Sequence, residues 1–414
     1  MANSKCLTIA YLGINSTCSL FSEQTTIGRL KLVATYRSAR VINLNKISSS
    51  AQINFTQTHP AISQYALLGA APSAIEMGYL SNDSFIDMAS VYQSSNQLIV
   101  WLGQANGTFD HGTPYSTNPL PVDLLLVELT NDNRLDILVL CLGSSNILLF
   151  VNLGGGIFAA KRTVGSTGSY SFPLSMTLVD FINNGLADVV TVCENPPYVG
   201  VLLNQNYTSG TQFTLVANTL YSSGPPNYYL VATAAAHFNA DSLADVATLT
   251  NDGNVVMYLG MGNGILTYLA TYTTRGFTTF SSCIVAADVN NDGNIDLSVT
   301  NTGSMTVAVL FGDGKGHMSV PILYQVGGAP THMRALYFDQ DGHLDLLVLT
   351  GSNCYTLLTG YFNGTFYTSI PCGYVPAGYV TNFAVGDING DGIPDMAITA
   401  TGTANVQMFL GSII

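Results

Sequence analysis

The stretch DVNNDGNIDLSV, residues 288–299, places three carboxylates within nine positions of a chain in which only 9% of residues are charged. Asp288, Asp292 and Asp296 would repel one another in so short a loop unless a cation neutralised them. Oxygen donors at positions one, three, five and nine, with glycine at position six for a sharp bend, suit calcium, which takes about 6 to 8 oxygen ligands. No soft ligands that would select zinc or copper are present in the loop. The loop therefore predicts a Ca²⁺ site.

A second loop, residues 387–395, repeats this pattern in full. The predicted side-chain ligands are Asp288, Asn290, Asp292 and Asp296 in the first loop and Asp387, Asn389, Asp391 and Asp395 in the second, and the backbone carbonyls of Asn294 and Ile393 can each add one more. The pattern is not an EF-hand, because that motif places Glu at position twelve between two helices. Here the ninth-position Asp opens an apolar strand.

The same final Asp recurs in seven loops, at Asp87, Asp136, Asp188, Asp245, Asp296, Asp345 and Asp395. The other five loops depart from the full pattern: Tyr337, His237, Ile182, Glu128 and Thr130 stand in ligand positions, and the loop ending at Asp87 retains only Asp83 as a second carboxylate. In such loops we expect Asx turns, in which Asp and Asn side chains accept backbone N–H groups without an ion. For the loop with Asp339, Asp341 and Asp345, calcium and Asx turns both stay open.

The spacing of these loops, 49 to 57 residues, defines a repeating unit. Each unit contains four short apolar segments separated by polar or glycine-rich turns, which predicts a four-stranded antiparallel meander. Turns such as LGMGNG, residues 259–264, are therefore expected to be hairpins rather than phosphate-binding loops. Because one meander cannot cover both of its own faces, neighbouring units must stack on one another.

Stacked units can form an open solenoid or a closed ring, and the chain ends favour the ring. The last unit, ending in VQMFLGSII, supplies only three strands, and an N-terminal strand could complete it and cover its edge. We predict an all-β fold, a β-propeller of eight four-stranded blades closed by residues 6–13, with Gly28 and Lys31 in an eroded first unit. The alternative is seven blades plus an N-terminal extension, with residues 53–68 closing the ring. Either way, residues 1–414 form one domain, with a degenerate first repeat at about 14–72 and clear repeats over 73–414.

Composition and motifs exclude several classes of function. A net charge of −13 with only 12 Lys and Arg argues against nucleic acid binding, and no apolar run is long enough for membrane insertion. The seven cysteines form no CxxC pair, which argues against a zinc site or a dense disulfide framework. No HExxH or Gly-x-Ser-x-Gly motif is present. We expect a monomeric domain that is not an enzyme.

The pattern D-x-N-x-D-G-x-x-D-L, followed by VLFGDGKGHM and GGAP, resembles the FG-GAP or VCBS repeat of integrin α-chain propellers and related extracellular proteins. Phe311-Gly312 and Gly328-Ala329-Pro330 match the letters that name the repeat. The resemblance implies an extracellular or cell-surface adhesion module in which calcium is structural and the ligand is a protein or a glycan. Six Asn-x-Ser/Thr sequons would fit an extracellular glycoprotein, at Asn15, Asn54, Asn82, Asn106, Asn206 and Asn363, whereas the N-terminus has no clear signal peptide.

The expected binding surface is the face of the ring opposite the acidic loops. Residues 194–200, 222–230 and 372–380 fall there and concentrate Pro and Tyr. Tyr is common in binding surfaces, and the alternative is that these tyrosines only fill strands and turns. The rival function is a calcium-dependent polysaccharide lyase, because similar repeats occur in such enzymes. A lyase needs basic residues to neutralise and deprotonate an acidic sugar, and no cluster of Lys and Arg is present.

Overall fold

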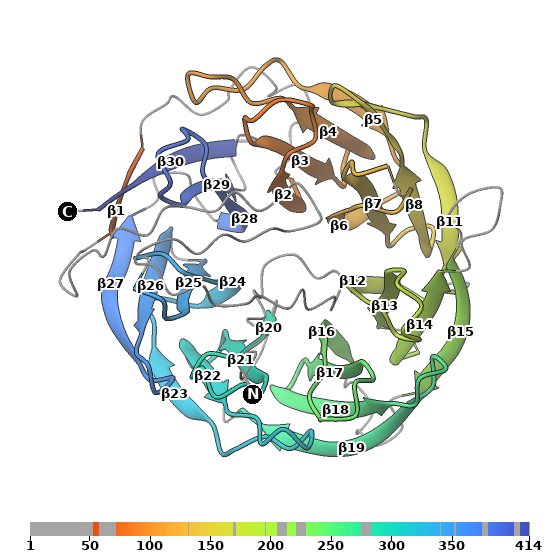
Figure 1. The fold of residues 1–414 in the computed structure, drawn as a ribbon, viewed down its shortest axis with the longest axis vertical. Coiled ribbons are helices and arrows are strands. Elements are labelled where there is room, and N and C mark those ends of the chain that lie inside the picture. Colours follow the sequence, from red (N-terminus) through yellow and green to blue (C-terminus); the bar gives the residue numbers. More distant parts are fainter. Residues whose placement is uncertain are drawn as a thin grey trace, which may run out of the picture.

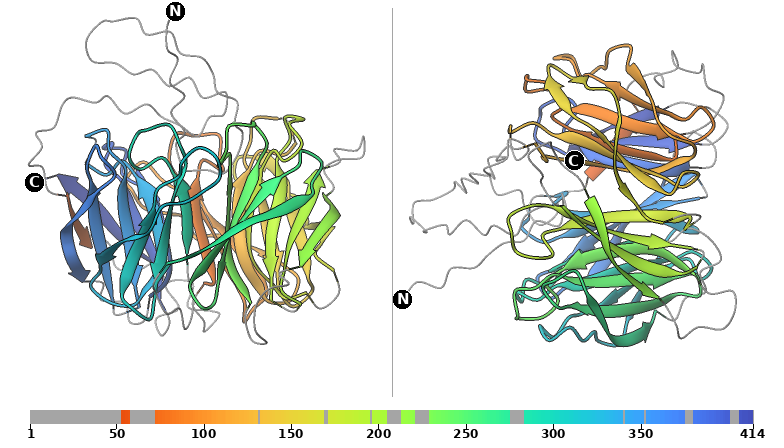
Figure 2. Two further views of the ribbon diagram at one scale, coloured as in Figure 1. Left: turned by 90° about the horizontal axis from the view of Figure 1, so that it is seen from below. Right: turned by 90° about the vertical axis from the view of Figure 1, so that its right-hand side faces the viewer.

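The computed structural model describes residues 53–57, 72–130, 132–168, 171–194, 196–204, 213–220, 229–274, 283–339, 341–351, 353–374, 380–400 and 406–413. The secondary structure elements of these residues are all β-strands. The strands form seven four-stranded antiparallel sheets, which are arranged as blades around a central axis (Figure 1). From the side the blades form a disc, and their strands run along its axis (Figure 2). The same residues contain no helix that is long and apolar enough to cross a membrane.

The blades follow one another in chain order. Blade 1 contains β2 (Ala74–Gly78), β3 (Asp87–Tyr92), β4 (Gln97–Trp101) and β5 (Thr113–Ser116). Blade 2 contains β6 (Pro121–Val127), β7 (Asp136–Cys141), β8 (Asn146–Phe150) and β11 (Arg162–Ser166), with a small hairpin of β9 (Asn152–Gly154) and β10 (Ile157–Phe158). Blade 3 contains β12 (Pro173–Val179), β13 (Asp188–Cys193), β14 (Tyr198–Asn204) and β15 (Phe213–Leu220). Blade 4 contains β16 (Leu230–Ala236), β17 (Asp245–Thr250), β18 (Asn254–Gly260) and β19 (Leu266–Thr273).

The remaining blades repeat the same order of strands. Blade 5 contains β20 (Ile284–Ala287), β21 (Asp296–Asn301), β22 (Thr306–Leu310) and β23 (Ile322–Gln325). Blade 6 contains β24 (Pro330–Leu336), β25 (Asp345–Thr350), β26 (Cys354–Gly360) and β27 (Phe366–Tyr374). Blade 7 contains β28 (Val380–Gly386), β29 (Asp395–Ala400) and β30 (Val406–Ile413), and β1 (Ile53–Gln57) is its outer strand.

The hydrophobic core consists of seven layers, one between each pair of neighbouring blades. The layer between blades 1 and 2, for example, contains Val91 and Val100 of the first blade and Val139 and Leu148 of the second. The second strand of a blade faces such a layer on both sides, which explains why all six residues of β7 are buried. A continuous apolar run is the expected sequence for a strand covered on both faces.

Seven blades, the alternative predicted from the sequence, are confirmed, and the eight-bladed arrangement is not. The outer strand of blade 7 is β1, in which Ile53 lies opposite Ile413, so the strand that completes the last sheet falls within residues 53–68. Met77 of blade 1 also packs in one buried cluster with Met408 of blade 7, which leaves no place for an eighth blade between them. Residues 6–13, Gly28 and Lys31 lie outside the described residues.

The first strand of each blade lies nearest the central axis (Figure 1), and an ion pair between two of these strands spans the closing blade. Arg334 on β24 of blade 6 contacts Glu76 on β2 of blade 1, with 2.5 Å between Nη2 and Oε1. The guanidinium of Arg334 also lies 6.0 Å from the ring centre of Phe383 on β28. The side chain therefore joins blades 6, 7 and 1 at the point where the ring closes.

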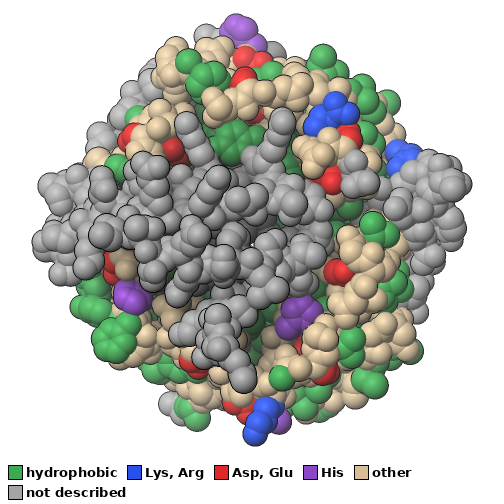
Figure 3. All heavy atoms as spheres, viewed as in Figure 1, with side chains coloured by type: hydrophobic (Ala, Val, Ile, Leu, Met, Phe, Trp, Pro, Cys, Tyr) green, Lys and Arg blue, Asp and Glu red, His purple; other side chains and the backbone are tan. Residues whose placement is uncertain are grey.

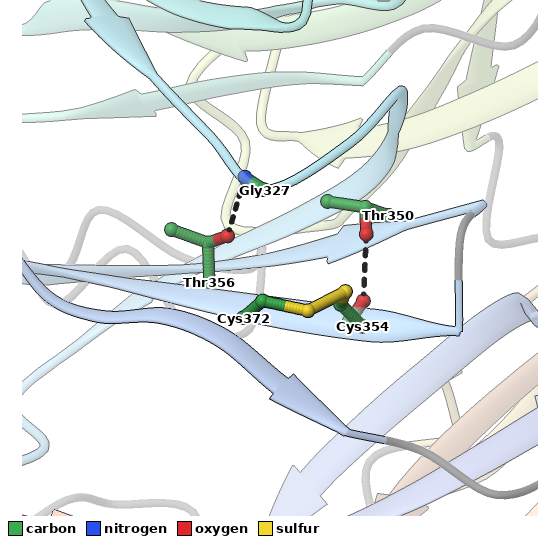
Figure 4. The surroundings of a disulfide bond; sticks show 5 residues. All are labelled: Gly327, Thr350, Cys354, Thr356 and Cys372. Atoms are coloured by element: carbon green, nitrogen blue, oxygen red, sulfur yellow. Dashed lines mark hydrogen bonds between the residues drawn. A yellow bond between two sulfur atoms is a disulfide. The ribbon is translucent and has the colours of Figure 1, made fainter.

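A disulfide between Cys354 and Cys372 joins β26 to β27 within blade 6 (Figure 4), with 5.2 Å between the two Cα atoms. Cys141 and Cys193 form no disulfide and are fully buried, each within a different blade. Burial raises the pKa of both thiols, that of Cys141 to about 11, so neither is poised as a nucleophile.

Candidate metal-binding loops

The ninth-position Asp joins two backbone segments in every blade. In blade 5, Oδ2 of Asp296 accepts the N–H of Val289 at 3.0 Å, and Oδ1 accepts the N–H of Gly312 at 2.8 Å. One carboxylate thus ties the start of the acidic loop to the end of the third strand. We call this arrangement the carboxylate clip.

The clip recurs with equivalent partners in the other six blades. The Asp residues and the backbone N–H groups that they accept are Asp87 with Leu80 and Gly103, Asp136 with Leu129 and Asn152, Asp188 with Phe181 and Asn204, Asp245 with Phe238 and Gly260, Asp345 with Phe338 and Gly360, and Asp395 with Ile388 and Gly411. All seven Asp side chains are fully buried. This Asp therefore has a role in the fold whether or not its loop holds an ion.

In five of the seven blades, the second N–H group of the clip comes from a glycine. A Cβ atom built at Gly312 would lie 2.2 Å from the carbonyl oxygen of Ile295, far inside van der Waals contact. The same clash, at 2.0–2.3 Å from a carbonyl oxygen, would occur at Gly103, Gly260, Gly360 and Gly411. In these five blades the close approach of the two segments requires glycine.

The two complete loops share one internal geometry. Oδ1 and Oδ2 of Asp288 accept the N–H groups of Asp292 and Gly293, at 3.1 and 2.8 Å. Asp387 accepts the equivalent groups of Asp391 and Gly392, at 3.0 and 2.9 Å. The side chains at positions one, three and five therefore gather around the loop backbone.

The donors at positions three and five also sit in Asx turns. Oδ1 of Asn290 accepts the N–H of Asp292 at 2.9 Å, and Oδ1 of Asp292 accepts the N–H of Asn294 at 2.7 Å. Each carboxylate or amide oxygen can accept a second partner, so these bonds leave lone pairs for a cation. The donor set is all oxygen and carries three negative charges, as calcium requires.

The arrangement of acidic side chains is looser than that of a closed metal site. Within the described residues, no group of three or more His, Cys, Asp or Glu side chains is placed to hold a metal ion. Asp296 and Asp395 are also engaged at both oxygens by the clip. Calcium at the ten predicted ligands therefore stays a prediction, with donors of the right chemistry in the right loops.

Burial and neighbouring carboxylates raise the pKa of the ninth-position Asp in both complete loops. Burial, together with the charges of Asp292 and Asp288, raises the pKa of Asp296 to about 7. Burial and the charge of Asp391 raise the pKa of Asp395 to about 7 as well. A cation in the loop would offset both effects.

On the face seen in Figure 3, acidic side chains occur at intervals around the ring, among few basic ones.

The incomplete loops contain the Asx turns that their sequences predict, and three of them have Tyr79, His237 or Tyr337 in place of a carboxylate at position one. In blade 4, Oδ1 of Asp241 accepts the N–H of Leu243 at 2.8 Å, and His237 stands at position one. In blade 2, Arg134 forms an ion pair with Asp132 at 2.5 Å, which neutralises the fifth-position carboxylate from within the chain.

The loop of blade 6 differs from the other loops. It retains carboxylates at positions three and five, Asp339 and Asp341, but has no acid at position one. Its Asp339 has a pKa raised to about 6, by burial first and then by the charge of Asp341. Burial and the charge of Asp339 raise the pKa of Asp345 well above its ordinary value. This loop has the charge for a cation but lacks one ligand, since Tyr337 stands at position one.

Only part of the opposite, Tyr-rich face can be compared with the prediction. Tyr198 is buried, and its hydroxyl donates to the carbonyl of Thr167, so it is a packing residue. Tyr374 is 70% exposed, as a binding residue should be, and Tyr229 is half-buried. Residues 221–228 and 375–379 lie outside the described residues.

The clip is the feature that reasoning from the sequence missed. Its signal is a glycine or asparagine 15 or 16 residues after each final Asp, such as Gly312 after Asp296. The Phe-Gly pair and the acidic loop are separate motifs in the sequence, and the structure joins them through the hydrogen bond from Gly312 to Asp296.

The FG-GAP-like repeat model matches residues 128–191, 237–299, 288–348 and 337–398, which together make up more than half of the chain. The chain therefore belongs to the FG-GAP-like repeat family. A search of the curated proteins found no match.

Solved structures share the fold at low sequence identity. BBS1N, solved in complex with ARL6DN, is 13% identical, with a TM-score of 0.56 over 84% of this chain and 94% of its own. A lectin from Agrocybe aegerita, solved for its recognition of non-reducing terminal N-acetylglucosamine, is 14% identical, with a TM-score of 0.50 over 88% of this chain and 85% of its own. Virginiamycin B lyase from Staphylococcus aureus is 11% identical, with a TM-score of 0.53 over 88% of this chain and 100% of its own. The propeller thus occurs in binding proteins and in an enzyme, and the fold alone does not separate the two.

Proposed function

We propose that this protein is a calcium-stabilised extracellular propeller that binds a protein or glycan partner as an adhesion module. The observation that carries the proposal is the contrast among seven loops built on one clip. Two of them, 288–296 and 387–395, place a carboxylate or amide side chain at all four ligand positions (one, three, five and nine), and five do not.

Calcium in these loops would be structural. The loop begins next to the residue whose N–H enters the clip and ends at the clip Asp itself. An ion held by Asp288, Asn290 and Asp292, or by their equivalents in blade 7, would fix the loop and with it the clip. Calcium would supply charge neutralisation and cross-linking there, and no chemical step depends on it.

An extracellular location is supported by the disulfide between Cys354 and Cys372, because such bonds persist in oxidising compartments. The absence of a basic cluster from the sequence, with 12 Lys and Arg against 25 Asp and Glu, disfavours an intracellular nucleic acid partner.

A binding role is supported by the named functions of structural neighbours, which include a lectin and a protein solved with a protein partner. The exposed ring of Tyr374 is the described residue that best supports partner binding on the face away from the acidic loops. We favour binding over polysaccharide cleavage because a lyase must neutralise an acidic sugar and this chain is itself strongly acidic.

Isothermal titration of the chelator-treated protein with calcium tests the metal part of the proposal. The wild type should bind two ions at the complete loops, and Asp292→Ala and Asp391→Ala should each remove one. Asp241→Ala, the equivalent change in an incomplete loop, is the matched control and should remove none. A wild type that binds no calcium would refute the metal sites.

A glycan array and a lyase assay on acidic polysaccharides, both run with calcium, test the partner and the reaction. The proposal expects retention of a glycan or a protein partner without cleavage. Release of unsaturated sugar products would replace it with the enzyme alternative.

A further inference from the structure

Two blades carry the tripeptide Asn-Gly-Thr at the tip of the turn between their third and fourth strands. In blade 1, Oδ1 of Asn106 accepts the N–H of Thr108 at 3.1 Å and its hydroxyl at 2.6 Å. In blade 6, Oδ1 of Asn363 accepts the N–H and the hydroxyl of Thr365 at the same two distances. Both Asn side chains are exposed.

The intervening glycines give both turns one backbone shape. Gly107 and Gly364 have φ angles of +74° and +73°, in the left-handed region that favours glycine. No hydrogen bond to Nδ2 of Asn106 or Asn363 is found within the described part of the chain. The amide nitrogen is therefore presented to solvent, while the amide oxygen is held by the threonine.

We propose that Asn106 and Asn363 carry N-linked glycans, an inference that rests on the proposed extracellular function. Asn-x-Ser/Thr is the acceptor sequence for this modification in surface loops of secreted proteins. The co-substrate is a polyprenyl-diphosphate-linked oligosaccharide. Nδ2 forms a bond to C1 of the first sugar, the bond from C1 to the diphosphate oxygen breaks, Nδ2 loses one proton, and the polyprenyl diphosphate leaves.

Within the described residues, no other sequon has this combination of features. Asn82 is exposed but lies inside an acidic loop, where its Nδ2 would be 3.4 Å from a Cβ built at Gly154 of the neighbouring blade. Asn54 lies within β1, and Asn15 and Asn206 lie outside the described residues. Asn106 and Asn363 alone are proposed.

Each glycosylated turn would stand beside one complete acidic loop. A Cβ built at Gly364 would lie 2.6 Å from Cβ of Asn290, and one built at Gly107 would lie 3.7 Å from Cβ of Asn389. Asn290 and Asn389 are predicted calcium ligands of blades 5 and 7. Glycans at these turns would cover the acidic-loop face of the ring and leave the opposite face, with Tyr374, to a partner.

The two turns differ in the residues before the Asn. Tyr361 and Phe362 precede Asn363 and are 48% and 73% exposed, whereas Gln104 and Ala105 hold these positions in blade 1. Tyr361 lies against the ring of Tyr367 and Phe362 lies against the ring of His343, so this turn has an aromatic surface. The first sugars on Asn363 would pack on the exposed sides of these rings.

The test is to express the full chain behind a cleavable signal peptide in a host that performs N-glycosylation. Intact mass is measured before and after treatment with peptide N-glycosidase F. Glycan mass should be lost from the wild type. Asn106→Gln and Asn363→Gln should each carry one glycan fewer, and so should Thr108→Ala and Thr365→Ala, which keep the Asn.

Blade 4 offers a matched gain-of-function control. Oδ1 of Asn263 accepts the N–H of Ile265 at 3.1 Å in the same turn, which lacks only the hydroxyl. Ile265→Thr should therefore gain one glycan at Asn263. In addition, Asn363→Gln should bind more of a hydrophobic dye than Asn106→Gln, because only the former uncovers aromatic rings.

Secreted, folded protein without enzyme-sensitive glycan at Asn106 and Asn363 would overturn the inference. Calcium titration of the same preparation reports on the proposed function separately. Glycan without calcium binding would refute the metal sites and keep this inference, and calcium binding without glycan would do the reverse.

Discussion

The loops of blades 5 and 4, residues 288–296 and 237–245, have the same scaffold but are expected to differ in their affinity for calcium. Both end in a buried clip Asp, and both place Asn at position three and Asp at position five. They differ at position one, where Asp288 is replaced by His237, and at position six, where Gly293 is replaced by Ser242. Ser242 adopts a φ of +63°, so the bend survives without glycine.

The two loops indicate that their polar residues have two different roles, one in holding the fold and one predicted in cation binding. The ninth-position Asp is present in all seven loops because it accepts buried backbone N–H groups at two places in its blade. The residues at positions one, three and five vary because the blade can form without a fixed side chain there. The recurring residue therefore holds the fold, and the varying residues decide whether a loop can take a cation.

Removal of a clip Asp should have the largest effect. Asp245→Ala leaves the buried N–H groups of Phe238 and Gly260 without acceptors, and each such group costs about 1 to 3 kcal/mol. The free energy of unfolding should fall by about 3 kcal/mol or more, measured by urea denaturation. Asp241→Ala, an exposed change in the same loop, should cost about 0.5 kcal/mol. Equal losses in the two variants would dismiss the clip as a stabilising contact.

Calcium should stabilise the wild type through loops 288–296 and 387–395. A single bound ion adds about 2.7 kcal/mol when calcium is at 100 times its dissociation constant. The melting temperature should therefore rise with calcium and fall again with a chelator. Asp292→Ala combined with Asp391→Ala should abolish the rise, whereas Asp241→Ala should leave it intact. A rise that survives in the double variant would place the ion elsewhere.

Stability should depend on pH when calcium is removed. The pKa of Asp296 and of Asp395 is raised to about 7 in the folded chain from the ordinary value of 3.8. Between these values the folded chain binds more protons than the unfolded chain, so stability falls as pH rises from about 4 to 7.

Urea midpoints measured at pH 5 and pH 8 test this dependence. The chelated protein should have the higher midpoint at pH 5. Saturating calcium should reduce the difference, because a bound ion favours the ionised carboxylates. An identical pH dependence with and without calcium would show that no ion interacts with these groups.

The smallest expected effect is the gain of a weak site in blade 4. His237→Asp supplies the missing acid at position one, and a second change, Ser242→Gly, supplies the glycine at position six. Calorimetry should detect a third calcium ion with low affinity, bound more tightly by the double variant. His317→Asp adds the same charge on an exposed turn and is the control. If both single variants behave alike, charge rather than loop geometry governs binding.

Much of the fold could be predicted from the sequence because the repeat is local. The spacing of the seven Asp residues and the four short strands between them indicated stacked meanders in a ring. The number of blades could not be settled in the same way, because it depends on which distant strand pairs with β30. Ile53 meets Ile413 only once the ring has closed.

The site was predictable in composition but not in its contacts. Sequence spacing identified the complete loops, yet the bond from Asp296 to Gly312 forms only when a hairpin brings the third strand back to the loop. The sequence likewise did not predict that the side chain of Tyr198 is buried in its blade. It also did not predict the disulfide between Cys354 and Cys372, because spacing alone does not place the two residues on neighbouring strands.

Anomalous scattering from crystals grown with calcium is the most direct test, because it locates each ion among seven equivalent loops. The account predicts one peak within loop 288–296, one within loop 387–395, and none within loop 237–245 or loop 180–188. No peak at either complete loop, or peaks of equal height at loop 237–245, would contradict it.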